Sequence, residues 1–443
     1  MTPNISKLIF CLLFCIGLHA ASYAPDLLKV LKDKFGVDNV ISKDSSAFKE
    51  YYEIRFRQPV DHRDTSRGFF TQLLLLGHND VMRPMIIETN GYEILPYQGL
   101  QYVAEPAKLL KGNQLIAEHR YFGASIPDSN NHTYLNFKEV SSDYHAIRNA
   151  FADIYKSEWI STGASKGGLT ALNYSFYYPE DINASIIYVA PILTSVEDKR
   201  IELFLKEKRK TETGKKLFTI QQNLLTRKQV LLPVFLDILK LSNLELGKMD
   251  PETLYDFAVL EFDFNYWQYI SDFPKLLDNN RRILNQLSKN GLANTSALQS
   301  EDDSLIAIFP MCIWYMLTES LSRPFFYQSF TQMGSYGYEE QLFKGLKHKK
   351  YSPEFLAGNH PRFSRKYVRT FTRFLRKDLK NTICIYGAED PWTSCRILTS
   401  EENLVIINPK TNHATLIKDV GDAPKKEIEK KLNDWLVTEV VVN

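Results

Sequence analysis

The sequence predicts an α/β fold in which a sheet domain carries a large helical insertion, and three observations support this prediction. Short apolar runs that end in glycine or polar residues occur in both halves of the chain, at residues 85–89, 115–117 and 382–386, as buried strands do. Between residues 194 and 369 these signals vanish, and Leu, Phe and Tyr recur at helical spacing. Gly163-Ala164-Ser165-Lys166-Gly167 follows a strand-like run and precedes a helix-compatible one. This Gly-x-Ser-x-Gly pattern is typical of the turn that exposes the nucleophile in α/β-hydrolases.

The chain is longer than one average domain, and an insertion into a single sheet domain accounts for its 443 residues. We therefore expect a leader at residues 1–21 and an α/β-hydrolase domain in two parts, at residues 22–193 and 370–443. A helical cap at residues 194–369 separates the two parts.

The first 21 residues have the pattern of a cleavable secretory signal. Lys7 precedes an apolar run at residues 8–18, and the small residues Ala20 and Ala21 mark the expected cleavage site. The run is short for a transmembrane helix, and no later segment has the roughly 20 apolar residues that a span needs. We expect a secreted or periplasmic protein that is free of the membrane after cleavage.

The segments before the insertion follow the order of a hydrolase sheet. A helix is expected at residues 25–35, and a hairpin at residues 51–56 and 69–76 turns at Asp61 and His62, which we interpret as turn residues bonded to backbone. The strand at residues 85–89 ends in Asn90-Gly91-Tyr92, where such folds place half of the oxyanion hole. Further expected elements are the strand at 115–117, the helix at 143–155, the strand before Ser165 and the strand at 185–190.

The segments after the insertion supply the partners that a serine nucleophile needs. Asp390 follows the expected strand at 382–386, and His413 follows the last expected strand, at 404–407. The order Ser, Asp, His is that of α/β-hydrolases. We predict that His413 takes the proton of Ser165 and that Asp390 orients the imidazole. The backbone N–H groups of Lys166 and of Gly91 or Tyr92 are predicted to hold the oxyanion.

Other residues compete for the triad roles, although their positions fit less well. Glu389 is a rival acid beside Asp390, while His119 and His360 are rival bases. Only His413 follows the final strand, and Asp390 has the loop position that the fold requires.

Composition and motifs exclude several other classes of protein. The 54 Lys and Arg residues balance 52 Asp and Glu, so the chain lacks the basic excess of a nucleic-acid-binding protein. It contains no His-Glu-x-x-His, no cysteine pair at zinc spacing and no Gly-rich phosphate loop, so we expect neither a metal nor another cofactor. Cys384 and Cys395 fit a disulfide, but burial as free thiols is the commoner fate of such residues. The sequence does not indicate an oligomeric state.

Longer motifs resemble a known group of enzymes. Residues 163–168, Gly-Ala-Ser-Lys-Gly-Gly, and residues 118–123, Glu-His-Arg-Tyr-Phe-Gly, resemble the secreted serine peptidases of families S28 and S37. The lysine after the nucleophile and the stretch Leu-Glu-Phe-Asp-Phe-Asn-Tyr-Trp-Gln at 260–268 look most like S37. The resemblance implies an exopeptidase that removes short peptides, typically tripeptides, from free N-termini, often after proline.

Such an enzyme must neutralise the α-ammonium group of its peptide substrate. Candidates for that carboxylate are Glu93, Glu261 and Glu319. Aromatic residues of the cap, including Trp267 and Tyr327, are candidates for a pocket that accepts an apolar or proline side chain.

Two other functions fit the same triad. A secreted carboxylesterase or lipase is one, although Asn90-Gly91-Tyr92 differs from the His-Gly-Gly-Gly run of many esterases. A catalytically inactive hydrolase fold that serves as a binding module is the other.

Overall fold

The computed structural model describes most of the chain outside its leader and parts of the insertion. The described residues are 26–94, 98–127, 131–241, 250–270, 272–289, 308–309, 319–339, 342, 346 and 362–442. The expected leader and His360 lie outside them.

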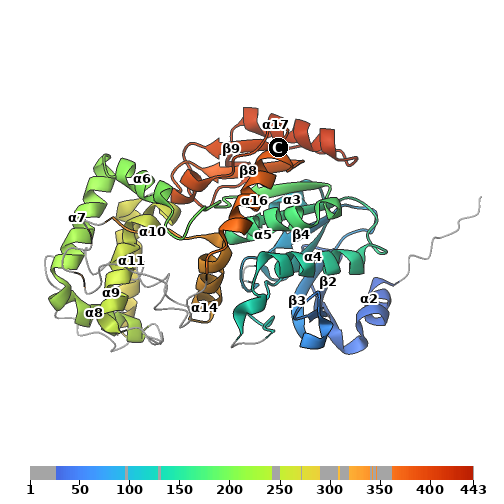
Figure 1. The fold of residues 1–443 in the computed structure, drawn as a ribbon, viewed down its shortest axis with the longest axis horizontal. Coiled ribbons are helices and arrows are strands. Elements are labelled where there is room, and N and C mark those ends of the chain that lie inside the picture. Colours follow the sequence, from blue (N-terminus) through green and yellow to red (C-terminus); the bar gives the residue numbers. More distant parts are fainter. Residues whose placement is uncertain are drawn as a thin grey trace, which may run out of the picture.

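A nine-stranded, mostly parallel sheet forms the centre of the molecule, which confirms the predicted α/β-hydrolase class (Figure 1). The strand order is β1-β2-β3-β5-β4-β6-β7-β8-β9. Along this order, neighbouring strands are antiparallel in the part β1-β2-β3-β5 and parallel in the part β5-β4-β6-β7-β8-β9. The strands are β1 (Val40–Lys43), β2 (Glu50–Pro59), β3 (Phe69–His78), β4 (Met85–Thr89), β5 (Asn113–Ala117), β6 (Trp159–Ala164), β7 (Ala184–Tyr188), β8 (Thr382–Gly387) and β9 (Leu404–Asn408).

Both faces of the parallel strands are buried, because alternate residues pack under helices on opposite sides. On β4, Ile86 belongs to the core under α3 (Glu105–Leu109) and α17 (Asp422–Trp435), whereas Met85 and Ile87 belong to the core on the other side. That second side is covered by α2 (Leu27–Phe35), α4 (Phe137–Phe151), α5 (Lys166–Tyr177) and α16 (Arg365–Lys377). The near-continuous apolar strand sequences follow from this double coverage.

The described part of the insertion consists mainly of helices. Its helices are α6 (Lys199–Lys208), α7 (Glu212–Thr226), α8 (Lys228–Leu241), α9 (Pro251–Leu260), α10 (Phe262–Tyr269), α11 (Phe273–Lys289) and α14 (Glu319–Gln328), which continues as a π-helix at Ser329–Met333. A separate core of Leu, Ile, Phe and Tyr side chains holds α6 to α11 together. These helices form a lobe beside the sheet, at the left of Figure 1.

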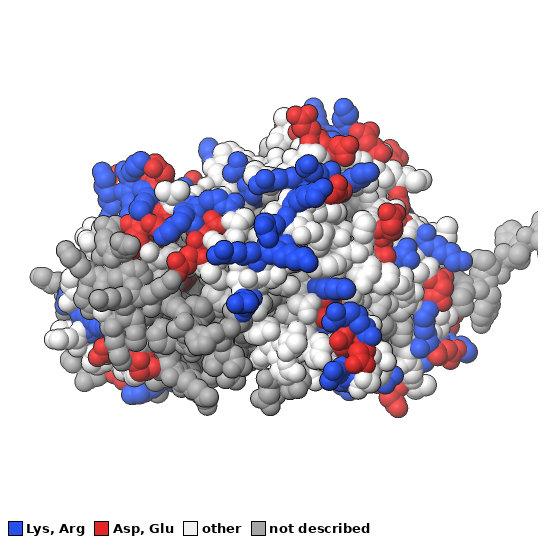
Figure 2. Space-filling model, viewed as in Figure 1, with Lys and Arg blue, Asp and Glu red and all other residues white. Residues whose placement is uncertain are grey.

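The helix α16 leads the chain back from the insertion and packs against the sheet domain. Phe371 and Leu375 are buried there, and the hydroxyl of Tyr367 donates to Asn173 Oδ1 of α5 at 2.6 Å. Its opposite face is exposed and cationic, and Figure 2 shows Lys and Arg side chains gathered over this part of the surface. The exposed cations of α16 are Arg365, Lys366, Arg369, Arg373, Arg376 and Lys377.

Cys384 and Cys395 are both free and buried, on β8 and in the loop that follows it. Burial raises the pKa of the Cys384 thiol, and it raises that of Cys395 to about 12. Both groups are therefore neutral thiols at physiological pH. In the part of the chain that the structure describes, no helix has the length and apolar character required to cross a membrane.

Candidate active site

Ser165 lies on a strained turn between β6 and α5. Its φ of 56° is in the left-handed region, where residues other than glycine are uncommon. Glycine is required on both sides of the turn. A Cβ on Gly163 would approach the carbonyl oxygen of Gly167 to 2.6 Å, and one on Gly167 would approach that of Thr89 to 2.5 Å. This close packing holds the serine at the carboxyl edge of the sheet, with its side chain partly accessible to solvent.

Asp390 and His413 meet at the same edge, because they follow β8 and β9, which continue the parallel part of the sheet beyond β6 and β7. His413 Nδ1 lies 2.6 Å from Asp390 Oδ2, and both side chains are almost fully buried. The other oxygen of Asp390 accepts from the Trp392 N–H at 3.1 Å, which fixes the carboxylate plane. His413 Nε2 is buried and has no hydrogen-bond partner among the described residues. A base needs this free nitrogen to receive a proton.

The insertion takes part in positioning the histidine. The backbone N–H of His413 donates to the carbonyl of Gln268, on α10, at 3.0 Å. The ring of Tyr269 packs edge-on against the imidazole at 5.6 Å. The acid loop is also held by the insertion, since Trp392 contacts the rings of Phe264 and Tyr336. His413 and the loop that carries Asp390 are therefore both held by contacts with α10.

The loop after β4 packs directly against the start of α5. A Cβ on Gly91 would lie 2.7 Å from Lys166 Cβ and 2.9 Å from the Gly167 nitrogen, so only glycine fits without displacing the helix. The hydroxyl of Thr89 donates to the Gly167 carbonyl at 2.8 Å and ties the strand end to the turn. As the first residue of α5, Lys166 has no intrahelical acceptor for its backbone N–H. The predicted donors of an oxyanion hole, Lys166 and Gly91 or Tyr92, thus lie together beside Ser165.

The Glu-His-Arg-Tyr-Phe-Gly motif at residues 118–123 holds the loop after β4 in place. Glu118 accepts from the backbone N–H of Ile94 at 3.1 Å and of Ala124 at 2.8 Å, which joins the loop after β4 to the loop after β5. Arg120 is fully buried and forms a bidentate ion pair with Asp143 at 2.6 and 2.7 Å. The motif is therefore part of the scaffold behind the oxyanion loop.

The residues that compete with Asp390 and His413 for the triad roles have other partners. Glu389 binds the ammonium group of Lys208. His119 is fully buried, and its Nδ1 lies 2.8 Å from the Arg120 carbonyl oxygen. His62 differs from expectation, because its ring contacts the Asp143 carboxylate at 2.8 Å and no backbone group, whereas Asp61 does accept from the Arg63 N–H as a turn residue.

Glu261 is a buried carboxylate without a cationic partner among the described residues. It lies directly before α10 and accepts hydrogen bonds from the hydroxyls of Tyr336, at 2.8 Å, and Tyr338. Burial raises its pKa to about 7, and the nearby charge of Asp263 acts in the same direction. Asp263 itself is paired with Arg209 at 3.2 Å. Of these two carboxylates of the insertion, only Glu261 is left to bind an external cation.

The other residues that we expected to contact substrate lie in different parts of the structure. Trp267 is buried on α10 beneath the Lys208 ammonium group, 4.6 Å from the ring centre. Tyr327 is half-buried on α14, two residues after Phe325, which contacts the Tyr92 ring at 6.0 Å. Glu93 is half-buried in the oxyanion loop. Glu319 begins α14, but its side chain lies outside the described part of the structure.

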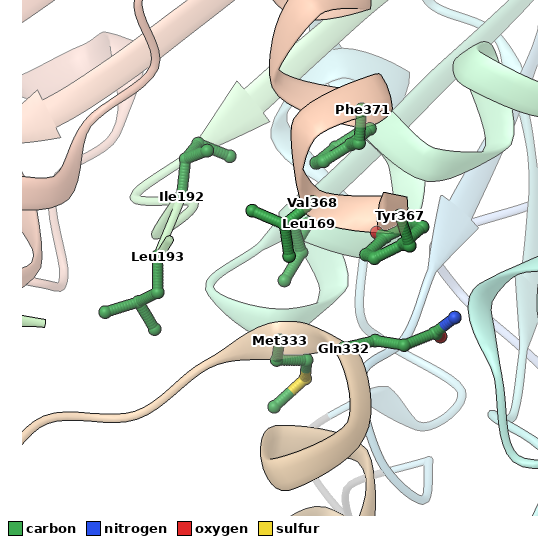
Figure 3. A pocket seen from close by; sticks show the side chains of 8 residues that line it. All are labelled: Leu169, Ile192, Leu193, Gln332, Met333, Tyr367, Val368 and Phe371. Carbon is green, nitrogen blue, oxygen red and sulfur yellow. The ribbon is translucent and has the colours of Figure 1, made fainter. Parts of the chain in front are cut away.

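A small apolar cavity lies behind the start of α5, between Leu169, Leu193 and Met333 (Figure 3). Gln332 of the π-helix directs its amide away from these side chains, and its Oε1 accepts from the Phe137 N–H at 2.8 Å. The cavity measures about 10 Å³, roughly the space for one water molecule, so it is a packing defect and not a ligand site.

Sequence reasoning missed several residues that shape the site. Gln268 acts through its backbone carbonyl, and Tyr336 and Tyr338 reach Glu261 from about 75 residues away along the chain. For Thr89, the sequence predicted only that it ends a strand. No local pattern signals such contacts, since they depend on how distant segments pack. Within the described ranges, no group of three or more His, Cys, Asp or Glu side chains is arranged to hold a metal ion.

Comparisons with known proteins point to one family of peptidases. The model of the PS-10 peptidase S37 family matches residues 24–441. The prolyl tri/tetrapeptidyl aminopeptidase of Streptomyces mobaraensis is 27% identical over 363 residues, which cover 77% of this chain and 70% of that protein. The lysosomal Pro-X carboxypeptidase of Mus musculus is 27% identical over 204 residues, 41% of this chain and 40% of that protein.

Two solved structures match this chain over most of its length, but with low TM-scores and low sequence identity. Rv0554 from Mycobacterium tuberculosis matches with a TM-score of 0.39 and 11% identity, over 86% of this chain and 98% of that one. The α/β-hydrolase MGS-M2 from a deep-sea metagenome matches with a TM-score of 0.35 and 13% identity, over 82% of this chain and 94% of that one. The fold assignment therefore rests on the strand order described above.

Proposed function

The chain belongs to the S37 family of serine peptidases, and we propose that it is a secreted exopeptidase that releases short peptides from free N-termini. The observation that carries this proposal is the Asp390–His413 pair, which lies at the sheet edge that also bears Ser165 and leaves Nε2 of the imidazole free. The leader pattern at residues 1–21 supports secretion.

The reaction proceeds through an acyl-enzyme on Ser165. His413 Nε2 takes the hydroxyl proton as the serine oxygen attacks the scissile carbonyl, and Asp390 stabilises the imidazolium through Nδ1–H. The backbone N–H groups of Lys166 and of Gly91 or Tyr92 receive the negative charge of the tetrahedral oxygen. His413 then gives its proton to the leaving amine, and water hydrolyses the acyl-enzyme by the same steps in reverse.

Glu261 is the group that we assign to the α-ammonium of the substrate. Its two tyrosine partners donate hydrogen bonds and supply no positive charge, so its own charge is uncompensated until a cation arrives. Lys208 already pairs with Glu389, and Arg209 already pairs with Asp263. Trp267 and Tyr327 are assigned to the substrate pocket as aromatic residues of the insertion.

The length of α10 supports release of a tripeptide. Glu261 and Gln268 are seven residues apart on this helix, which corresponds to about 10 Å at 1.5 Å per residue. Because Gln268 holds the backbone of His413, we take this rise as the separation that the proposal requires between the ammonium site and the reacting bond. Three residues of extended chain also span about 10 Å. A preference for proline at the cleavage site is supported by the names of both relatives, the prolyl aminopeptidase and the Pro-X carboxypeptidase.

The test is to offer the purified protein a proline-containing tetrapeptide amide with a free N-terminus, its N-acetylated form and a short-chain p-nitrophenyl ester. We expect release of a tripeptide, identified by mass spectrometry, from the free peptide and little from the acetylated one. Ester turnover without peptide cleavage would instead identify a carboxylesterase. Absence of labelling of Ser165 by a fluorophosphonate in folded protein would identify an inactive binding module.

A further inference from the structure

The side chain of Lys166 is buried without a carboxylate partner. Only 3% of the residue is exposed, and its ammonium nitrogen lies 4.3 Å from the centre of the Phe122 ring and 4.9 Å from that of Tyr92. Among the described residues no Asp or Glu forms an ion pair with it, and burial lowers the pKa of the lysine well below its ordinary value. The neighbouring His119 is held neutral, because burial and then the Lys166 charge lower its pKa. Removing an ammonium group from water in this way is costly, and aromatic rings compensate for it only in part.

Among the described residues, the hydrogen bond of this side chain is made with the loop after β4, at residues 90–94, which we call the oxyanion loop. Lys166 Nζ donates a hydrogen bond to the backbone carbonyl of Gly91. The carbonyl of Gly91 and the N–H of Tyr92 belong to the same planar peptide unit and point in opposite directions when the bond is trans, as it is here. Fixing the carbonyl on one side therefore fixes the direction of the Tyr92 N–H on the other. No backbone acceptor for that N–H is found in the described part of the chain.

We propose that the Lys166 side chain is a positioning residue for the oxyanion hole: it holds the Gly91–Tyr92 peptide so that the Tyr92 N–H faces the oxygen bound by the Lys166 N–H. One residue thus contributes one oxyanion donor through its backbone and orients the other through its side chain. Gly91 makes this possible, because its lack of Cβ lets the loop lie against Lys166 Cβ. The inference rests on the acyl-transfer reaction proposed above and names the residue that aligns its second donor.

Lys166→Met tests this role, since methionine fills much of the same space without a hydrogen-bond donor. We expect kcat to fall by about 100-fold, the usual loss when one oxyanion donor is removed. KM should change by less than about threefold, because the ground-state carbonyl gains less from the hole than the transition state does. The melting temperature should stay the same or rise, because a desolvated and unpaired charge is removed. Lys166→Gln, which keeps a donor, should recover part of kcat.

A transition-state mimic separates positioning from general damage to the fold. A peptide aldehyde forms a tetrahedral adduct with the serine, and its inhibition constant should rise in proportion to the loss of kcat/KM in Lys166→Met. The matching peptide alcohol, which forms no adduct, should bind both proteins equally. Lys228→Met is the matched control. It removes a largely buried lysine of the insertion that pairs with Asp256, a carboxylate outside the proposed site, at 2.9 Å, so it should lower the melting temperature and leave kcat within about twofold.

Three results would overturn the inference: kcat of Lys166→Met within twofold of the unaltered protein, equal loss of affinity for aldehyde and alcohol, or a Lys166→Gln variant as impaired as Lys166→Met. Hydrolysis of p-nitrophenyl acetate provides an independent readout, because ester cleavage uses the same oxyanion hole. If the unaltered protein cleaves the ester but no peptide, the proposed exopeptidase function fails while the role of Lys166 is still measured.

Discussion

Glu261→Gln is the change that most directly tests the proposed selection of free N-termini. Glutamine keeps the shape of the side chain but carries no charge, and its Oε1 can accept from one of the two tyrosine hydroxyls while its NH2 group donates to the other. A hydrogen bond to a charged group contributes about 1.5–3 kcal/mol, so kcat/KM for a peptide with a free N-terminus should fall by roughly 10- to 100-fold. Cleavage of the N-acetylated peptide should not change, because it has no ammonium group to lose.

The same variant should alter the pH dependence of the enzyme. Burial raises the pKa of Glu261 to about 7, so the carboxylate is protonated, and unable to neutralise an ammonium group, below that pH. For the free peptide we therefore expect a part of kcat/KM that rises with pH through about 7 and that is absent in Glu261→Gln. Hydrolysis of an uncharged ester should not show this component in either protein.

Glu261→Gln should raise the stability of the folded protein at high pH, although it lowers activity towards free peptides. A raised pKa means that the folded state holds the Glu261 proton more tightly than the unfolded state does, so this contribution to stability is complete below the ordinary pKa and is lost as the pH rises through about 7. At pH 8 the variant should be more stable than the unaltered protein, by up to ~3 kcal/mol in the free energy of unfolding for a shift of this size. Denaturant titrations at pH 5 and pH 8 measure the difference.

Asp263→Asn is the matched control, two residues away on the same helix. Asp263 already pairs with Arg209, so its loss should reduce stability and leave the preference for free over acetylated peptides intact. If Glu261→Gln keeps that preference, or if Asp263→Asn loses it equally, the assignment of Glu261 to the ammonium group is wrong.

Three further changes test the triad and the turn. Ser165→Ala should abolish peptide cleavage with an unchanged melting temperature, and activity within tenfold of the original would remove Ser165 from the mechanism. Asp390→Asn should lower kcat by about 10⁴-fold, as loss of the acid does in other Ser-His-Asp enzymes, and a loss of less than tenfold would favour another acid. Gly167→Ala should cost about 1–3 kcal/mol of folding stability or displace the oxyanion loop, because its Cβ would meet the Thr89 carbonyl at 2.5 Å; normal stability together with normal kcat would contradict the packing described here.

The sequence by itself determined the features that depend on neighbouring residues or on chain order. Gly163, Ser165 and Gly167 specify a turn whose steric demands are local, and that turn is present. Parallel strands end at a common edge, so residues that follow β8 and β9 meet there whatever the insertion does, and Asp390 lies 2.6 Å from His413. The apolar runs likewise predicted buried strands, and the strands of the sheet are packed under helices on both faces.

Tertiary structure decided the contacts between segments that are far apart in the chain. The carbonyl of Gln268 holds His413 across 145 residues of sequence, a backbone contact that no residue type announces. The sequence offered Glu93, Glu261 and Glu319 on equal terms, and only the packing of the insertion shows that Asp263 pairs with Arg209 while Glu261 is bound by two tyrosine hydroxyls. Lys166 was notable in the sequence only for its place after the nucleophile, and its bond to Gly91 exists because the fold packs the two backbones too closely for any side chain at Gly91. Such contacts are set by the packing of whole elements, whereas the turn and the order of the triad are set by local sterics and by the direction of the strands.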